Sequence, residues 1–130
     1  MHRARAIAVS LSVLLCACPQ RTAVWVGAGS TADSLTLVLG KWRGREDHLS
    51  THLRIDRCGY DWLEDNEDRA LWKGYVAGSR VVYRDSSDAA DMRGAPALGP
   101  GCYHVTTSGT GEVAFTVDSL GRVTQLDSVP

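Results

Sequence analysis

The stretch CYHVTTSGTGEVAFTVDSLGRVTQLD, residues 102–127, decides the predicted fold. Val113, Phe115 and Val117 alternate with polar or small residues, and this period of two is typical of a β-strand with one buried face. Two glycine-bearing turns divide the stretch into three strands, residues 102–107, 112–118 and 122–127. Because connections this short join antiparallel neighbours, the stretch predicts a three-stranded meander.

The rest of the chain continues the pattern of short strands separated by glycine-bearing turns. The clearest example is residues 51–58, where Leu53 and Ile55 alternate with polar side chains. Gly78-Ser79 stands between two further strands and favours a type II′ hairpin turn. The further strands are expected at residues 23–26, 34–39, 69–77 and 80–84. About 7–8 strands without a convincing helix predict an all-β fold, an antiparallel β-sandwich or small barrel, in a single β domain from residue 23 to 130.

Two longer stretches lack a strand pattern. Residues 40–50 are polar and predict a loop or a ragged hairpin, and residues 86–101, with Pro96 and Pro100, form the longest irregular stretch. Loops this long are uncommon in a compact domain unless they are mobile or functional. The aromatic residues that fall in strands are expected in the core, and they are Trp25, Trp72, Tyr75, Tyr83 and Phe115.

The N-terminal residues have the layout of a secretory signal peptide. Arg3 and Arg5 precede an apolar run from Ala6 to Leu15. At about ten residues, this run is too short to span a bilayer as a helix and suits the hydrophobic part of a signal peptide. It leads directly into Leu15-Cys16-Ala17-Cys18.

This stretch resembles the lipobox of bacterial lipoproteins, in which a small residue precedes the cysteine that receives a diacylglyceryl group on its sulfur. The resemblance implies a signal peptide of residues 1–17, lipidation of Cys18 and a short tether of residues 18–22, since Leu15 is a poor small residue for cleavage before Cys16. A plain secreted protein is the alternative.

The residue after the lipidated cysteine bears on location. Lipoproteins of this kind carry Asp there when they are retained in the inner membrane, and Pro19 stands at that position. The resemblance therefore implies the outer membrane of a two-membrane cell, facing the periplasm, rather than the inner membrane. Residues 96–103 and the glycine-rich terminal hairpins are likewise similar to small bacterial lipoproteins with all-β domains.

The cysteine count fits this assignment. With Cys16 removed in the leader and Cys18 consumed as a thioether, Cys58 and Cys102 remain, and two thiols in an oxidising compartment are expected to pair. Both alternate with the apolar residues of their predicted strands and so share the polar face. Cys58 is the last residue of one strand and Cys102 is the first residue of another. Antiparallel neighbours that meet in this way have opposite Cα atoms within disulfide range. We predict a disulfide at the periphery of a sheet.

The charge of the mature chain argues against nucleic acid as a partner. Taking the leader's two arginines from the 14 basic residues leaves 12, against 15 acidic residues, a formal charge of −3. Binding to phosphate needs clustered Lys and Arg, and no such cluster occurs. The partners we expect are the membrane, through the N-terminal lipid, and another envelope protein.

The acidic loop 60–68 is the candidate for ligand binding. Its aromatic residues Tyr60 and Trp62 could stack on a sugar ring while Asp61 and Glu64 bind the hydroxyls. The same aromatic side chains could instead anchor a protein partner, or cap the open end of the sandwich. The loop has oxygen ligands for calcium, but it lacks the spacing and the mid-loop glycine of an EF-hand, so a solvated loop is favoured over a metal site.

No catalytic, metal or cofactor site is predicted. His48 and His52 have the spacing of zinc ligands on a helix, but the strand expected at 51–58 removes that geometry. Cys58 and His104 would give a nucleophile and a base, but a disulfide sulfur is not a thiolate. No Gly-x-Ser-x-Gly elbow occurs. The glycine-rich turn at 108–111 joins two strands rather than opening a phosphate-binding helix.

Together these features predict a lipid-anchored bacterial envelope lipoprotein with a non-enzymatic role in binding or assembly. The alternative function is a carbohydrate- or calcium-binding module that uses the acidic aromatic loop 60–68.

Overall fold

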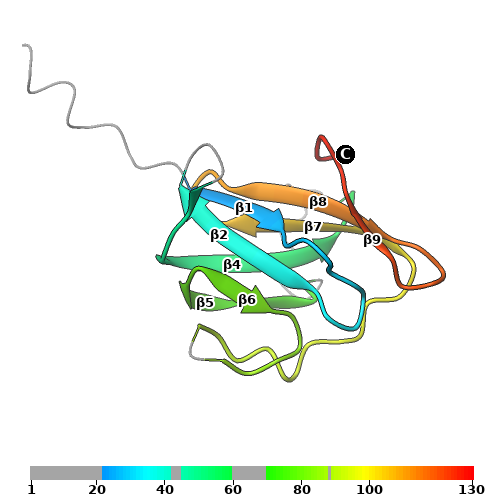
Figure 1. Cartoon of the computed structure of the whole chain (residues 1–130), viewed down its shortest axis with the longest axis horizontal. Helices are drawn as coiled ribbons and strands as arrows, with labels where there is room; N and C mark the ends of the chain where they lie inside the picture. Colours follow the sequence, from blue (N-terminus) through cyan, green and yellow to red (C-terminus); the bar gives the residue numbers. More distant parts are fainter. Residues whose placement is uncertain (1–21, 42–44, 60–69, 88) are drawn as a thin grey trace, which may run out of the picture.

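The structure is a computed structural model that describes residues 22–41, 45–59, 70–87 and 89–130. Strands and irregular segments make up this part of the chain (Figure 1). The strands are β1 (Thr22–Val26), β2 (Thr36–Lys41), β3 (Arg45–Glu46), β4 (Leu49–Arg57), β5 (Trp72–Gly78), β6 (Arg80–Val82), β7 (Gly101–Thr107), β8 (Glu112–Val117) and β9 (Val123–Gln125). None of the described residues belongs to a helix that could cross a membrane.

The strands form two antiparallel sheets that pack face to face (Figure 1). One sheet has five strands in the order β5-β4-β7-β8-β9. In the other sheet β2 pairs with β1 on one side and with β3 and β6 on the other. This arrangement is a small β-sandwich, which confirms the predicted fold class.

The predicted C-terminal meander is confirmed. β7, β8 and β9 are sequential neighbours, with Tyr103 opposite Phe115 and Phe115 opposite Gln125. The alternating residues Val113, Phe115 and Val117 of β8 are all buried. Period-two patterning therefore reports the buried face of this sheet correctly.

The core lies between the two sheets. The five-stranded sheet contributes Leu53 and Ile55 from β4, Tyr103 from β7 and Phe115 from β8, all fully buried. The rings of Tyr103 and Phe115 stack with centroids 5.5 Å apart. From the opposite sheet the core receives Val24, Leu37, Leu39 and Val81. Burying this apolar area drives the packing of the two sheets.

The irregular segment 83–100 completes the core rather than standing apart from it. Met92, Ala95 and Leu98 are buried in the same cluster as the strand residues. Tyr83 donates a hydrogen bond of 2.7 Å from its hydroxyl to the carbonyl of Pro96, and burial raises the pKa of this hydroxyl to about 12. In Figure 1 the segment runs along the lower side of the sandwich between β6 and β7. Its apolar side chains take the place of a further strand.

The predicted hairpin at Gly78-Ser79 is wrong. β5 pairs with β4 in the five-stranded sheet, whereas β6 pairs with β2 in the other. The carbonyl of Ser79 accepts a hydrogen bond of 2.7 Å from the amide of Leu39, so the chain turns a corner from one sheet to the other. A Gly-Ser pair suits either a tight hairpin or a sharp corner, and the strand partners decide between them.

The expectation that Tyr75 lies in the core is also wrong, since this side chain is 56% exposed. Along β5, Trp72 lies opposite Ile55 and packs against the core, and Val76 is fully buried. Because Tyr75 has the opposite parity, it faces outward. Tyr83 and Phe115 are buried as expected, and Trp25 is half-buried.

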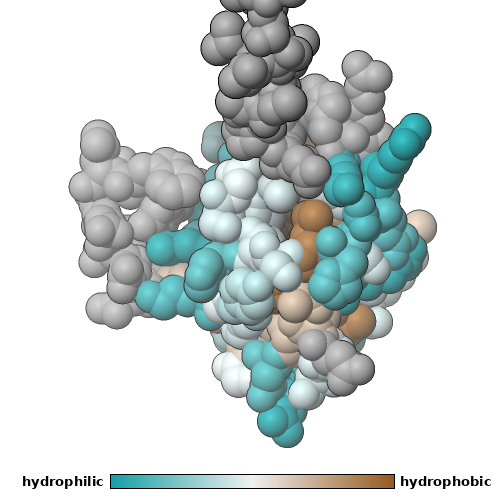
Figure 2. All heavy atoms as spheres, turned by 90° about the vertical axis from the view of Figure 1, so that its left-hand side faces the viewer, coloured by the Kyte–Doolittle hydropathy of each residue, from teal (hydrophilic) through white to brown (hydrophobic). Residues whose placement is uncertain are grey.

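The sandwich has two ends that differ in what they carry. We call the end at which β1 begins the β1-start end; it holds Thr22, Lys41 and the 108–111 turn. The opposite end holds Cys58, Cys102 and the 118–122 turn, and we call it the disulfide end. Figure 2 looks onto the β1-start end and shows a narrow apolar strip between hydrophilic residues.

Candidate functional site: the disulfide end and outer face of the five-stranded sheet

The predicted disulfide between Cys58 and Cys102 is confirmed. Cys58 directly follows β4, Cys102 is the second residue of β7, and their Cα atoms are 5.3 Å apart. The amide of Cys58 also donates a 3.1 Å hydrogen bond to the carbonyl of Cys102. Both cysteines are half-buried at the end of the sheet, so the bond is peripheral, as the strand parity predicts.

The disulfide continues a row of polar pairs on the outer face of the five-stranded sheet. Asp56 lies opposite His104, and Arg54 lies opposite Thr106. The sequence predicts a polar face here, yet Asp56 and His104 are only 4% and 8% exposed. Both side chains therefore lie on the outer face, as the alternation along their strands predicts. The expectation that they are exposed to solvent there is wrong.

Asp56 is held by its neighbour on the same strand. The Nε atom of Arg54 donates to both carboxylate oxygens of Asp56, at 3.0 and 2.9 Å. A carboxylate without a partner is costly to bury, and a guanidinium is the side chain that best satisfies it. The ion pair therefore allows an acidic group to be buried at this position.

His104 is the less satisfied member of the row. Its Nε2 atom lies 3.4 Å from Oε2 of Glu112, which permits an ion pair when the imidazole is protonated. That separation is too long for a well-formed hydrogen bond, and the buried Nε2 atom has no hydrogen-bond partner among the described residues. A buried donor or acceptor left in this state costs stability.

Next to this row the outer face carries an exposed aromatic pair. Tyr75 of β5 lies opposite His52 of β4, and their rings meet edge to face with centroids 5.6 Å apart. Tyr75 and Leu120 are the large hydrophobic residues most exposed in the described part of the chain. Exposed tyrosines are enriched at protein interfaces.

The disulfide end also carries a shallow groove of about 500 Å³. One wall is the turn between β1 and β2, and the other is β9 with the preceding Arg122. The amide of Val26 donates a 2.8 Å hydrogen bond to the side-chain oxygen of Gln125 across the groove. Residues this far apart in the chain give no local sequence pattern, so the groove was not predictable from the sequence.

The β1-start end has surface ion pairs instead. Lys41 pairs with Asp47 at 3.0 Å, and Arg80 pairs with Glu46 at 2.8 Å.

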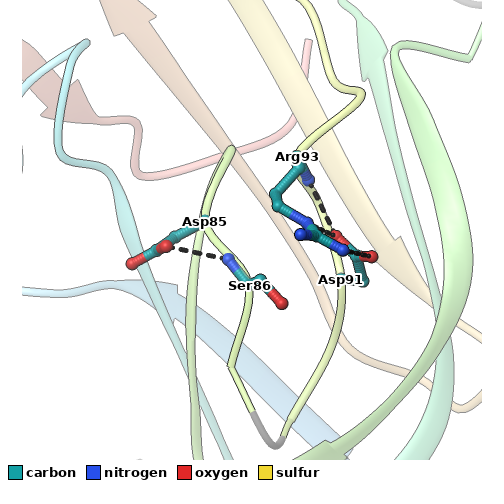
Figure 3. Close-up of polar contacts among 4 residues, drawn as sticks. All are labelled: Asp85, Ser86, Asp91 and Arg93. Atoms are coloured by element: carbon teal, nitrogen blue, oxygen red, sulfur yellow. Dashed lines mark hydrogen bonds and ion pairs between the residues drawn. The ribbon is translucent and has the colours of Figure 1, made fainter.

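In the irregular segment, Arg93 donates to both carboxylate oxygens of Asp91, and the amide of Ser86 donates to the side chain of Asp85 (Figure 3). The hydrogen bonds from Arg93 lower the pKa of Asp91 to about 2. All of these groups are exposed, so solvent screens them.

Several predicted site residues lie outside the described part of the chain. These are the lipobox residues Leu15-Cys16-Ala17-Cys18 and the proposed ligand-binding residues Tyr60, Asp61, Trp62 and Glu64. Gly59 and Ala70, which flank the acidic loop, are described. Both belong to the disulfide end, because β4 ends at Arg57 and β5 begins at Trp72.

The described residues form neither the zinc site of His48 and His52 nor the nucleophile–base pair of Cys58 and His104. His52 lies in strand β4, which excludes the helical zinc geometry with His48. Cys58 is bonded to Cys102, so its sulfur is not a thiolate beside His104. No group of three or more His, Cys, Asp or Glu side chains in residues 22–41, 45–59, 70–87 and 89–130 could hold a metal ion.

Comparisons with known proteins found no matching protein family, no matching curated protein and no matching solved structure.

Proposed function

We propose that the chain is a lipid-anchored bacterial envelope lipoprotein that binds or assembles other envelope components and is not an enzyme. The anchor is a diacylglyceryl group on Cys18, the first residue after the signal peptide 1–17. In a two-membrane cell, its place is the outer membrane, facing the periplasm. The observation that carries the proposal is the stretch Leu15-Cys16-Ala17-Cys18 behind a basic and then apolar leader.

The cysteine inventory supports export. The chain has four cysteines, and the two in the folded domain form a disulfide. Disulfides persist in oxidising compartments such as the periplasm and are rare in the cytosol of most bacteria. Removal of Cys16 and lipidation of Cys18 would leave no free thiol in the mature protein.

The outer surface supports a binding role. Tyr75 and His52 form an exposed aromatic pair, and the disulfide end adds the groove beside Arg122 and Gln125. The pair lies on the neighbouring strands β4 and β5, and strand β9 forms one wall of the groove. Rigid elements position binding groups more accurately than loops do. A protein partner that supplies apolar or aromatic side chains would suit the pair.

Paired cysteine variants test the anchor. The full chain, expressed in a bacterium with a lipoprotein pathway, is compared with Cys18→Ser and with the matched control Cys16→Ser. Cys18→Ser should remove diacylglycerol labelling and release the protein from the membrane fraction or leave it uncleaved. Cys16→Ser should behave like the wild type, because Cys16 leaves with the leader.

Two results would overturn the proposal. One is normal lipid labelling and membrane retention of Cys18→Ser. The other is loss of labelling in Cys16→Ser with normal labelling in Cys18→Ser, which would move the lipid to Cys16.

A further inference from the structure

We propose that the β1-start end of the sandwich faces the membrane and that the disulfide end points away from it. This inference rests on the proposed lipidation of Cys18. It adds an orientation, and therefore a division of the surface into a side that contacts lipid headgroups and a side presented to partners.

The first step is the reach of the tether. β1 begins at Thr22, four residues after Cys18. Fully extended chain spans at most about 3.6 Å per residue, so Thr22 can lie no more than about 14 Å from the lipidated residue in any conformation. The start of β1 is thereby held close to the headgroups.

The second step is what shares that end with Thr22. Its side-chain oxygen bonds the hydroxyl of Thr107 at 3.0 Å and accepts the amide of Gly111 at 3.1 Å. Thr22 also lies opposite Lys41 in the β1–β2 register. The 108–111 turn and the end of β2 are therefore fixed beside Thr22.

The third step is the length of the sandwich. β4 runs from Leu49 at the β1-start end to Arg57 beside the disulfide, nine residues in all. From the first Cα to the last there are eight steps of about 3.3 Å, so the strand is about 26 Å long. Because that length exceeds the tether, the disulfide end cannot replace the β1-start end at the membrane.

The surface of the β1-start end is compatible with lipid headgroups. The 108–111 turn is Ser-Gly-Thr-Gly and carries no charge. The carboxylates of Glu46 and Asp47 are each paired with a cation, whereas no ion pair is formed by the exposed Arg45 among the described residues. Arg45, with which no described acid pairs, is attracted by anionic lipids, and its charge offsets the exposed carboxylate of Glu112 that follows the turn.

The orientation places two features of the disulfide end. The groove beside Arg122 and the flanks of the acidic loop, Gly59 and Ala70, are held on the side away from the membrane. A partner approaching from the periplasm would meet them first.

Two matched label positions test the orientation. Thr110 and Leu120 lie in the turns at opposite ends of β8, and both are exposed. The full chain with Thr110→Cys or Leu120→Cys is produced in lipidated form, labelled with a fluorophore without reduction of the native disulfide, and reconstituted in phosphatidylethanolamine–phosphatidylglycerol vesicles. A spin label on the lipid headgroups is the quencher, and mass spectrometry establishes the lipid on Cys18.

The label at Thr110→Cys should lose most of its fluorescence, while the label at Leu120→Cys should keep nearly all of it. Equal quenching of the two labels, or stronger quenching at Leu120→Cys, in a protein with lipid on Cys18 would overturn the orientation and leave the anchor intact. Absence of lipid from Cys18 in the mature wild-type protein would overturn the proposed function, and the orientation with it.

Discussion

The two ends of the sandwich are held together in different ways. At the disulfide end a covalent bond joins the residue after β4 to the second residue of β7. At the β1-start end, Thr22 is joined to the 108–111 turn by hydrogen bonds, and Thr51 bonds Ser108 at 2.7 Å. Exposed ion pairs such as Lys41–Asp47 add little, since solvent screens them.

This difference indicates where the domain opens first. Regions held by a few partly exposed hydrogen bonds undergo local unfolding at lower free energy than regions with a constrained backbone. We therefore expect amide exchange to be faster at the β1-start end than beside Cys58 and Cys102. The more rigid end is the one that carries the groove and flanks the acidic loop.

Removing the covalent constraint should have the largest effect. The Cys58→Ala, Cys102→Ala double variant opens a loop whose ends are 44 residues apart, which in the chain-entropy model lowers the free energy of unfolding by about 4 kcal/mol. Denaturant unfolding under non-reducing conditions measures the loss. Reduction of the wild type should cause the same loss of unfolding free energy. If neither change altered the unfolding free energy, the disulfide would not constrain its end more than hydrogen bonds constrain the other.

Crowding the β1-start end should have the next largest effect. A Cβ on Gly40 would overlap the carbonyl of Arg45 and lie 2.9 Å from the ring of Trp25. Overpacking of this kind costs about 1–3 kcal/mol, so Gly40→Ala should unfold at a lower denaturant concentration. Gly94→Ala is the control because a Cβ there meets no atom within 4 Å. Equal stability of the two variants would contradict the tight β2–β3 contact.

Removing the charge of Asp56 in the buried polar row should lower the free energy of unfolding by a smaller amount. Asp56→Asn keeps the size of the side chain but removes the charge that Arg54 binds at 2.9 Å. Hydrogen bonds to charged groups contribute about 1.5–3 kcal/mol, and the partial exposure of Arg54 places the expected loss at the lower limit, about 1.5 kcal/mol. Thermal unfolding compares this variant with Asp127→Asn, an exposed position. Equal melting temperatures would mean that the outer face does not depend on this pair.

The smallest effect is expected at the exposed pair Asp91–Arg93. Hydrogen bonds from Arg93 lower the pKa of Asp91 to about 2, so the pair stabilises the fold above the unfolded pKa near 4 and this contribution is lost as the pH falls through about 2. Asp91→Asn should melt slightly below the wild type at pH 6, and the gap should shrink as the pH falls toward 2. A gap that widens toward pH 2 would reverse the assigned sign.

The regular parts of the fold could be predicted from the sequence because burial follows strand parity. Val113, Phe115 and Val117 face the core as their alternation indicates, and the same parity placed the disulfide between Cys58 and Cys102 outside the core, at the periphery of the sheet. Both features are local to one strand or to one pair of neighbouring strands.

Other features depended on contacts between distant segments. Met92 and Leu98 fill the core from an irregular segment. Because its backbone has no regular period, the spacing of these residues in the sequence does not predict their burial. The burial of Asp56 and His104 depends on what covers the outer face, which parity does not report. Gly78-Ser79 turns from one sheet to the other because β6 pairs with β2, a strand more than forty residues earlier.

The mass of the mature N-terminal peptide tests the central claim most directly. The full chain is expressed with its leader, extracted from membranes, digested without reduction and analysed by mass spectrometry. The account predicts a first peptide that begins at Cys18 and carries a diacylglyceryl group on the sulfur, together with a disulfide-linked pair of peptides containing Cys58 and Cys102. A mature chain with an unmodified thiol at Cys18, or with an N-terminus at another residue, would contradict it.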